Sequence, residues 1–152
     1  MEQQKLPDFM GLYHAWEQLR PGPKAELKRA GKPGDMFETP AFYRLFSGIA
    51  TREWEKLAYQ RLIFCLPYIT HTGDDVGLGK ALAKGDRVSE KRLFQIIRSE
   101  TPNDMIHLRR VLQMAEPKAN WPRAAILLWY WNERSKRDLL EDYFMNHTSR
   151  TR

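Results

Sequence analysis

Residues 86–112 read DRVSEKRLFQIIRSETPNDMIHLRRVL and predict two helices joined by a short turn. Ser89 is a candidate N-cap for the first helix. Thr101 and Pro102 are expected to open the second with a capping-box-like pattern and proline at its first position. In each helix the apolar residues share one side, at about 100° per residue. They are Leu93, Ile96 and Ile97 in the first helix and Met105, Leu108, Val111, Leu112 and Ala115 in the second. The stretch therefore predicts a packed pair of amphipathic helices.

Basic side chains gather around this predicted helix pair. Against four acids, the stretch holds Arg87, Lys91, Arg92, Arg98, Arg109 and Arg110. Arg110 is expected opposite the apolar face and Arg109 on its flank. A basic rim over a packed helix pair is typical of a site for a polyanion. The solvated side of an ordinary amphipathic helix has the same pattern, so both interpretations are open at this point.

One line along the first helix combines two cations with an aromatic ring. Lys91, Phe94 and Arg98 follow one another at i, i+3 and i+7. Proteins that bind single strands stack bases on exposed rings beside cations. Phe94 is the candidate ring, although core packing is the favoured interpretation of it.

Length and composition limit the class of protein. The chain has 152 residues, 42% hydrophobic and 29% charged, which suits one compact domain or two small bundles that share a core. The longest apolar runs, 62–66 and 124–131, fall far short of the roughly 18 residues that cross a bilayer. No signal-peptide pattern is visible, so we expect a cytoplasmic location. Cys65 is the only cysteine, which excludes an internal disulfide and predicts a buried thiol in its apolar run.

The positive charge is concentrated in one half of the chain. Residues 1–76 hold 10 basic and 10 acidic side chains, whereas residues 77–152 hold 15 and 9. All of the net charge of +6 therefore belongs to the second half. Such asymmetry indicates a face for nucleic acid or another polyanion.

The rest of the chain predicts helices as well. They are expected at 8–20, 24–30, within 37–46 with Pro40 at the helix start, and at 52–66, 78–84, 120–131 and 133–146, with Thr51 as a candidate cap. The apolar run 124–131 should be the most buried element of the second half. Residues expected to point inward from the last helix are Leu139, Leu140, Tyr143 and Phe144. No alternating strand pattern is visible. The predicted fold is all-α, with two small helical bundles, 1–76 and 77–152, packed together as one compact unit.

Three cations lie near the start of the last predicted helix, namely Arg134, Lys136 and Arg137. Positive charge at a helix N-terminus opposes the helix dipole. This placement hints that the cations serve a partner, although ordinary surface chemistry is the favoured interpretation.

The loop between the halves, HTGDDVGLGK at 71–80, has the composition of a phosphate-binding loop but not its pattern. Five residues rather than four separate Gly73 from Gly79, and Ala81 stands where a P-loop needs a hydroxyl. His71 with the following aspartates lacks a suitably spaced second histidine for a metal site. We interpret the loop as a turn that leads into a helix, and we expect no metal and no cofactor.

Nine segments of the chain resemble, in order, segments of the CasB family, the small subunit of the type I-E CRISPR Cascade complex. The resemblance covers about residues 9–145. The matching segments are Leu12–Trp16, Pro40–Leu45, Phe64–Leu66, Gly79–Ala83, Arg92–Arg98, Asp104–Leu112, Ala115–Pro117, Trp121–Pro122 and Leu139–Asp142.

The resemblance implies a helical, non-catalytic protein of two small bundles. It implies a second copy of the chain, the backbone and large Cascade subunits, crRNA and target double-stranded DNA with its displaced strand as partners, and no membrane. The function that it implies is to grip nucleic-acid backbones and stabilise the R-loop during antiviral defence. The positions that would do so are Arg29, Arg98 and Arg110, with Arg52 and Arg134 as weaker correspondences. The pattern of charges adds Lys91, Arg92 and Arg109.

Two features of the chain qualify this resemblance. The 71–80 loop is short and acidic, which argues against a nucleic-acid contact there. The first half has no net charge and is expected to meet protein neighbours. The alternatives are a stand-alone helical DNA-binding protein, such as a helix-turn-helix regulator, and a pure protein scaffold. An enzyme is least favoured because the four histidines are scattered and no nucleophile and base are paired.

Overall fold

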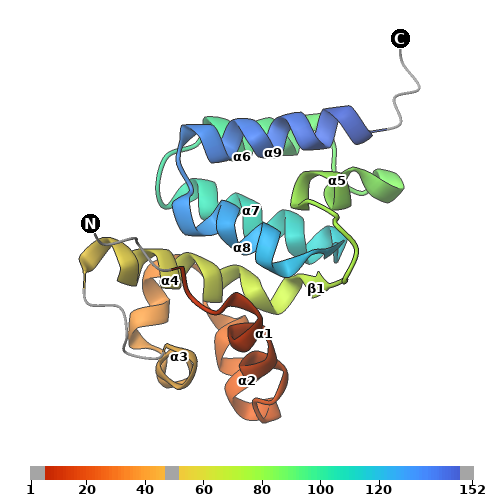
Figure 1. The fold of residues 1–152 in the computed structure, drawn as a ribbon. Coiled ribbons are helices and arrows are strands. Elements are labelled where there is room, and N and C mark those ends of the chain that lie inside the picture. Colours follow the sequence, from red (N-terminus) through yellow and green to blue (C-terminus); the bar gives the residue numbers. More distant parts are fainter. Residues whose placement is uncertain (1–5, 47–51, 148–152) are drawn as a thin grey trace, which may run out of the picture.

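The computed structural model describes residues 6–46 and 52–147, and these residues are predominantly helical (Figure 1). The first half contains α1 (Phe9–Glu17), α2 (Pro21–Arg29), α3 (Pro40–Leu45) and α4 (Glu53–Cys65). The second half contains α5 (Leu78–Ala83), α6 (Glu90–Arg98), α7 (Asn103–Ala115), α8 (Trp121–Tyr130) and α9 (Glu133–Asn146). Short 3-10 helices occupy Pro33–Glu38 (η1), Leu66–Tyr68 (η2) and Lys84–Asp86 (η3). The prediction of an all-α fold is confirmed. Within the described residues no helix is long and apolar enough to span a bilayer.

Helix α4 lies between the elements of the two halves. In Figure 1 it runs below α7 and α8 and above α1 to α3, and it packs against α2, η1, α7 and α8. Its buried residues Leu62, Ile63 and Phe64 join one hydrophobic cluster that also contains Phe42 and Trp121. One core therefore extends through both halves, and the division at residue 76 stays a prediction.

Two very short strands form a link that the sequence did not reveal. Strand β1 (Thr70–His71) pairs in parallel with β2 (Lys118–Ala119). The amide of Thr70 donates to the carbonyl of Pro117, and the amide of Thr72 donates to that of Ala119, each at 3.0 Å. Two residues per strand are too few for an alternating pattern, so periodicity could not predict them. The link ties the end of the first half to the connection between α7 and α8.

Gly79, at the end of the 71–80 loop, serves helix packing. A Cβ atom on Gly79 would lie 2.5 Å from the carbonyl oxygen of Leu139 and 2.8 Å from the backbone nitrogen of Tyr143. Helices α5 and α9 therefore approach so closely that only glycine fits at this position. Asp142 of α9 also accepts a 2.8 Å hydrogen bond from the amide of Lys80 in the first turn of α5. The loop thus leads into α5, as the sequence analysis expected.

Two predicted helix boundaries are wrong, and both lie at a proline. Helix α2 begins at Pro21 rather than at Lys24, because proline fits the first turn of a helix. The expected helix start at Pro40 is confirmed, since Pro40 begins α3 after η1. Pro102 is the N-cap of α7 rather than its first residue. The predicted cap Thr51 lies outside the described residues.

The second half is less uniformly buried than expected. Within the run 124–131, Leu128 and Trp129 are buried, but Ile126 is 41% and Tyr130 is 46% exposed. The run therefore has an outer side, whereas five of the six residues of α5 are buried. The prediction that the run is the most buried element of the second half is wrong. Leu139 and Tyr143 point inward, whereas Phe144 is exposed. An all-apolar run gives no helical phase, so these exposed positions could not be identified from sequence.

Candidate nucleic-acid interface

The cations of α6 lie on its outer side because of the way the helix is capped and packed. Ser89 is the N-cap, and its Oγ accepts a 3.2 Å hydrogen bond from the amide of Arg92, as predicted. Leu93 and Ile96 are completely buried against the core. The basic side chains on the remaining surface are exposed; they are Lys91, Arg92 and Arg98.

Arg98 lies over the ring of Phe94. Its Cζ atom is 4.7 Å from the ring centre, a distance at which the cation is attracted to the ring. Phe94 is only half-buried, and its ring is 6.0 Å from that of Phe144 on α9. Phe94 thus packs against a neighbouring helix and also supports an exposed cation. The packing expected for Phe94 is therefore partial, and base stacking on its ring stays a prediction.

Arg110 projects from the exposed side of α7. The opposite side of this helix is formed by buried residues, among them Met105, Leu108 and Leu112. Helices α6 and α7 pack against each other and run in opposite directions (Figure 1). We call the outer surface of this helix pair, with Lys91, Arg92, Arg98 and Arg110, the hairpin face. Within residues 6–46 and 52–147 none of these four cations has a carboxylate within 4.0 Å.

Arg109 corrects the prediction of a basic rim, because it is buried and only 4% exposed. Its Nη2 atom donates to the carbonyls of Lys28 and Leu27, at 2.6 and 3.3 Å, and to the hydroxyl of Tyr68 at 3.2 Å. Its guanidinium also lies 4.3 Å from the ring centre of Phe64. Arg109 caps the C-terminal end of α2, where a cation is favoured by the unpaired carbonyls. We therefore exclude it from the candidate interface.

This cap places the end of α2 beside α7. Arg29 is the last residue of α2 and is exposed. It directly follows Lys28, whose carbonyl is held by Arg109. Arg29 and Arg110 therefore project from backbones that the Arg109 side chain joins. The end of α2 that carries Arg29 is thus fastened to α7.

Arg61 makes the corresponding connection in the other direction. From α4, its Nε and Nη2 atoms donate to the carbonyls of Leu128 and Trp129, at 2.8 and 2.6 Å, at the end of α8. Removal from water lowers the pKa of Arg61, although the carboxylate of Asp104 acts in the opposite sense. We refer to Arg61 and Arg109 together as the junction arginines. Sequence reasoning missed them because their partners are backbone carbonyls far away in the chain.

Lys136 has an internal partner, contrary to the suggestion that it serves a ligand. Its Nζ atom lies 3.1 Å from a carboxylate oxygen of Asp104 and 3.0 Å from the carbonyl of Ser99. The same Asp104 oxygen accepts a 2.9 Å hydrogen bond from the indole of Trp131. Asp104 is 2% exposed, and a buried carboxylate needs such partners. This network fastens the start of α9 to the start of α7.

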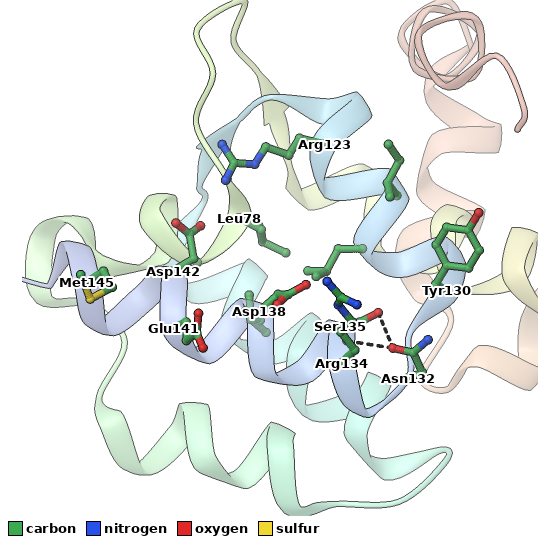
Figure 2. A pocket seen from close by; sticks show the side chains of 15 residues that line it. Leu78, Arg123, Tyr130, Asn132, Arg134, Ser135, Asp138, Glu141, Asp142 and Met145 are labelled. Atoms are coloured by element: carbon green, nitrogen blue, oxygen red, sulfur yellow. Dashed lines mark hydrogen bonds between the residues drawn. The ribbon is translucent and has the colours of Figure 1, made fainter.

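Arg134 lies in a different environment from the hairpin face. It lines an open pocket of about 590 Å³ between α8 and α9. Figure 2 shows Arg134 and Asp138 directed into this pocket, with Arg123 of α8 facing Asp142 of α9. The other lining residues include Glu141 and the exposed apolar side chains Ile126, Tyr130 and Met145. The structure thus places Arg134 among carboxylates and apolar side chains, apart from the cations of α6 and α7.

Arg52 lies at the opposite end of α4 from the segment that contacts Arg109. It is exposed, and it forms the N-cap of α4. Tyr68, which contacts Arg109, follows the other end of that helix. With 13 residues, α4 is about 20 Å long. The structure therefore leaves Lys91, Arg92, Arg98 and Arg110 exposed on the paired helices α6 and α7, and it places Arg29, Arg52 and Arg134 on other elements.

Cys65 is buried, as predicted. Burial raises the pKa of its thiol to about 12, so the group is neutral at ordinary pH. Its Sγ atom packs 3.5 Å from the sulfur of Met105. Among the described residues there is no group of three or more His, Cys, Asp or Glu side chains that could hold a metal ion.

The fold and its exposed cations define a small helical protein whose surface suits a polyanion. Residues 23–144 match the model of a family described as CRISPR-associated protein Cse2. The chain belongs to this family. The resemblance to CasB that the sequence analysis found is thereby confirmed.

Individual relatives agree with this assignment. The chain is 39% identical to the CRISPR system Cascade subunit CasB of Escherichia coli, with 91% of this chain and 93% of that protein covered. A chain in the crystal structure of E. coli Cascade bound to a PAM-containing double-stranded DNA target superposes with a TM-score of 0.89 at 38% identity, covering 93% and 97% of the two chains. CasB from Thermus thermophilus, at 13% identity and a TM-score of 0.67, covers 92% of this chain and 99% of its own length and shares the fold.

Proposed function

We propose that this chain is the small, non-catalytic subunit of a type I-E Cascade complex and that its hairpin face holds the displaced DNA strand of the R-loop. The observation that carries the proposal is the set of four exposed cations on α6 and α7 that lack carboxylate partners within the described residues. Membership of a family with a Cascade subunit supports it, as does the likeness to a chain in a DNA-bound Cascade structure.

The mechanism is neutralisation of phosphates without readout of bases. Each cation that pairs with a phosphate releases condensed counterions, which favours binding in dilute salt. The planar guanidinium of arginine can bridge two phosphate oxygens, and it does so irrespective of sequence. In the R-loop, the heteroduplex gained is about as stable as the DNA duplex lost. A few backbone contacts can therefore decide whether the duplex stays open.

In this role the chain performs no chemical step and uses no cofactor. Its partners are the backbone and large subunits of the complex, a second copy of itself, crRNA and target DNA, in the cytoplasm. The sequence information resides in the guide RNA, so the subunit needs no contacts to base edges. The first half, which has no net charge, and the pocket between α8 and α9 are the surfaces that we assign to protein neighbours.

The test combines assembly with DNA retention. The Arg98→Ala/Arg110→Ala variant is compared with wild type in the guide-loaded type I-E complex from the same source. Arg20→Ala/Arg44→Ala is the matched control, because both residues are exposed and removing them subtracts the same charge from the first half. We expect all three to assemble and only the hairpin variant to release DNA faster. Its salt slope should be shallower by about 1.4, for two single-strand phosphates.

A pure protein scaffold is the second candidate, and the pocket shown in Figure 2 favours it. Exposed apolar side chains gathered in one patch with charged residues around it are typical of a surface that meets another protein. Under this alternative the hairpin variant assembles and retains DNA as wild type does. A stand-alone DNA-binding protein predicts instead that the lone chain binds duplex DNA with sequence preference. Failure of the wild type to join the complex would refute membership of Cascade.

A further inference from the structure

The outer side of α6 carries an open notch of about 380 Å³. Its lining residues are Lys91, Phe94, Gln95, Arg98 and Ser99. An aromatic ring, a planar cation and a side-chain amide are thus brought together on two turns of one helix. Neutralising phosphates requires neither a ring nor an amide, so these groups indicate an additional role for the notch.

The geometry of Arg98 presents a stacking surface. Its guanidinium lies over the Phe94 ring, with Cζ 4.7 Å from the ring centre. Because Arg98 is exposed, the opposite face of the guanidinium remains accessible. Unpaired bases stack on aromatic rings and on guanidinium planes in proteins that bind single strands. A base placed on this face would extend the stack of ring and cation by one layer.

Contacts with α9 and within α6 hold the side chains of the notch in position. The ring of Phe94 lies 6.0 Å from that of Phe144 on α9. At the end of α6, the hydroxyl of Ser99 donates to the carbonyl of Gln95 at 2.6 Å, and Lys136 of α9 donates to the carbonyl of Ser99 at 3.0 Å. A site that is already ordered loses less conformational entropy when a ligand binds.

The charges of the notch suit a nucleotide rather than an isolated apolar group. Neither Lys91 nor Arg98 has a carboxylate within 4.0 Å in the described part of the chain. They are seven residues apart, about 10 Å along the helix axis. That length corresponds to about three nucleotides of a strand that rises 3.4 Å per residue. A strand whose base lies on Arg98 can therefore bring a nearby phosphate to Lys91.

We propose that this notch binds one unstacked nucleobase of single-stranded DNA, with the base stacked on the guanidinium of Arg98 over Phe94 and a flanking phosphate on Lys91. The inference rests on the proposed function of the hairpin face and adds a contact to the base. The stack accepts any base, because every base has a π-face. Such binding is consistent with a subunit that holds a strand of any sequence.

The test compares two strands with equal phosphate number. The full chain is titrated at low salt with a short oligothymidylate and with the same strand made abasic at its central positions, and binding is followed by fluorescence anisotropy. Wild type should bind the intact strand at least about fivefold more tightly. Arg98→Lys keeps the positive charge but removes the planar guanidinium group. This variant should therefore lose the preference for the intact strand and still bind the abasic strand as wild type does. Phe94→Leu should lose the preference as well.

Arg44→Lys is the matched control, because it makes the same exchange at an exposed arginine outside the hairpin face. It should keep the full preference. Circular dichroism melting establishes that the variants are folded, and Arg98→Lys changes only an exposed side chain. Equal binding of the two strands by wild type, or an undiminished preference in Arg98→Lys, would overturn the base site and leave the phosphate-binding face. Absence of binding to both strands would overturn the two proposals together.

Discussion

The junction between the two halves and the hairpin face both use arginine, and they use it in opposite ways. At the junction, Arg61 and Arg109 are turned inward and donate to the last carbonyls of α8 and α2. On the hairpin face, Arg92, Arg98 and Arg110 are exposed. Arg109 and Arg110 are adjacent in sequence, so about 100° of helical rotation separates a structural cap from a candidate DNA contact. Helical phase and the neighbouring element decide the role, and residue type does not.

We expect substitutions of buried residues to lower the stability of the chain most, above all where α5 meets α9. Gly79→Ala would place a methyl group 2.5 Å from the carbonyl oxygen of Leu139, so backbone must move. We expect a loss of about 2 to 3 kcal/mol in the free energy of unfolding, measured by urea denaturation. Gly22→Ala is the control, because no atom lies within 4 Å of its added Cβ. Equal midpoints for the two variants would show that α5 and α9 can separate at little cost.

The junction arginines provide the next largest effect. Arg109→Met keeps an unbranched side chain but replaces the charged guanidinium with an apolar end. The hydrogen bonds to the carbonyls of Leu27 and Lys28 are thereby lost. The expected loss in the free energy of unfolding is about 2 kcal/mol, since the donor is charged and the site is buried. Arg110→Met makes the identical exchange one residue later on an exposed side. A common shift of the urea midpoint in both variants would refute the distinction between junction and face.

We expect alkaline pH to lower the stability of the folded chain through the buried thiol of Cys65. Burial raises the pKa of Cys65 to about 12, above the value of about 8.5 for an exposed thiol. The thiol therefore contributes its full stability below the unfolded pKa, and this contribution is lost as pH rises towards the folded value. We expect wild type to lose about 1 to 2 kcal/mol of unfolding free energy by pH 10, measured by thermal or urea unfolding at a series of pH values.

Cys65→Ala serves as the comparison for this pH dependence. The variant should be less stable at every pH, yet its stability should decline less between pH 8.5 and pH 10. Burial also raises the pKa of Tyr143, whose hydroxyl donates to the carbonyl of Val88 at 2.7 Å. A further decline at higher pH is therefore expected in both proteins. Parallel curves for wild type and variant would exclude Cys65 as the source.

The smallest effect on stability is expected on the hairpin face. Arg110→Met should change the free energy of unfolding by no more than about 0.5 kcal/mol, because the side chain is exposed. Its effect should appear in DNA binding instead, as a decrease of about 0.7 in the slope of log K against log salt concentration. The measurement is a salt titration of DNA binding by the assembled complex. An unchanged slope would remove Arg110 from the hairpin face.

Local signals in the sequence predicted much of the fold. The cap Ser89 and the phase of Leu93 and Ile96 define α6, and the same reasoning placed Arg110 on the outside of α7. These predictions depend only on neighbours within a turn or two of the helix. The family was identified from ordered segments along the whole chain, which carry more information than any single motif.

Contacts between distant segments account for what the sequence did not predict. Arg109 was assigned to the flank of its helix, where only the position of α2 could decide whether it is exposed. The pairing of Thr70 with Lys118 has no periodic pattern. The phase of the run 124–131 is undefined because every residue in it is apolar. In each case the outcome depends on a residue that is distant in sequence. A single sequence does not show which distant residues come into contact.

The position of Arg109 next to Arg110 has a mechanical consequence. Under the proposed function, a DNA strand held at Arg110 would pull on α7 one residue away from the side chain that binds the carbonyls of Leu27 and Lys28. Tension on the strand would then reach α2 and, through Tyr68, the segment that follows α4. Both halves of the chain would share the load.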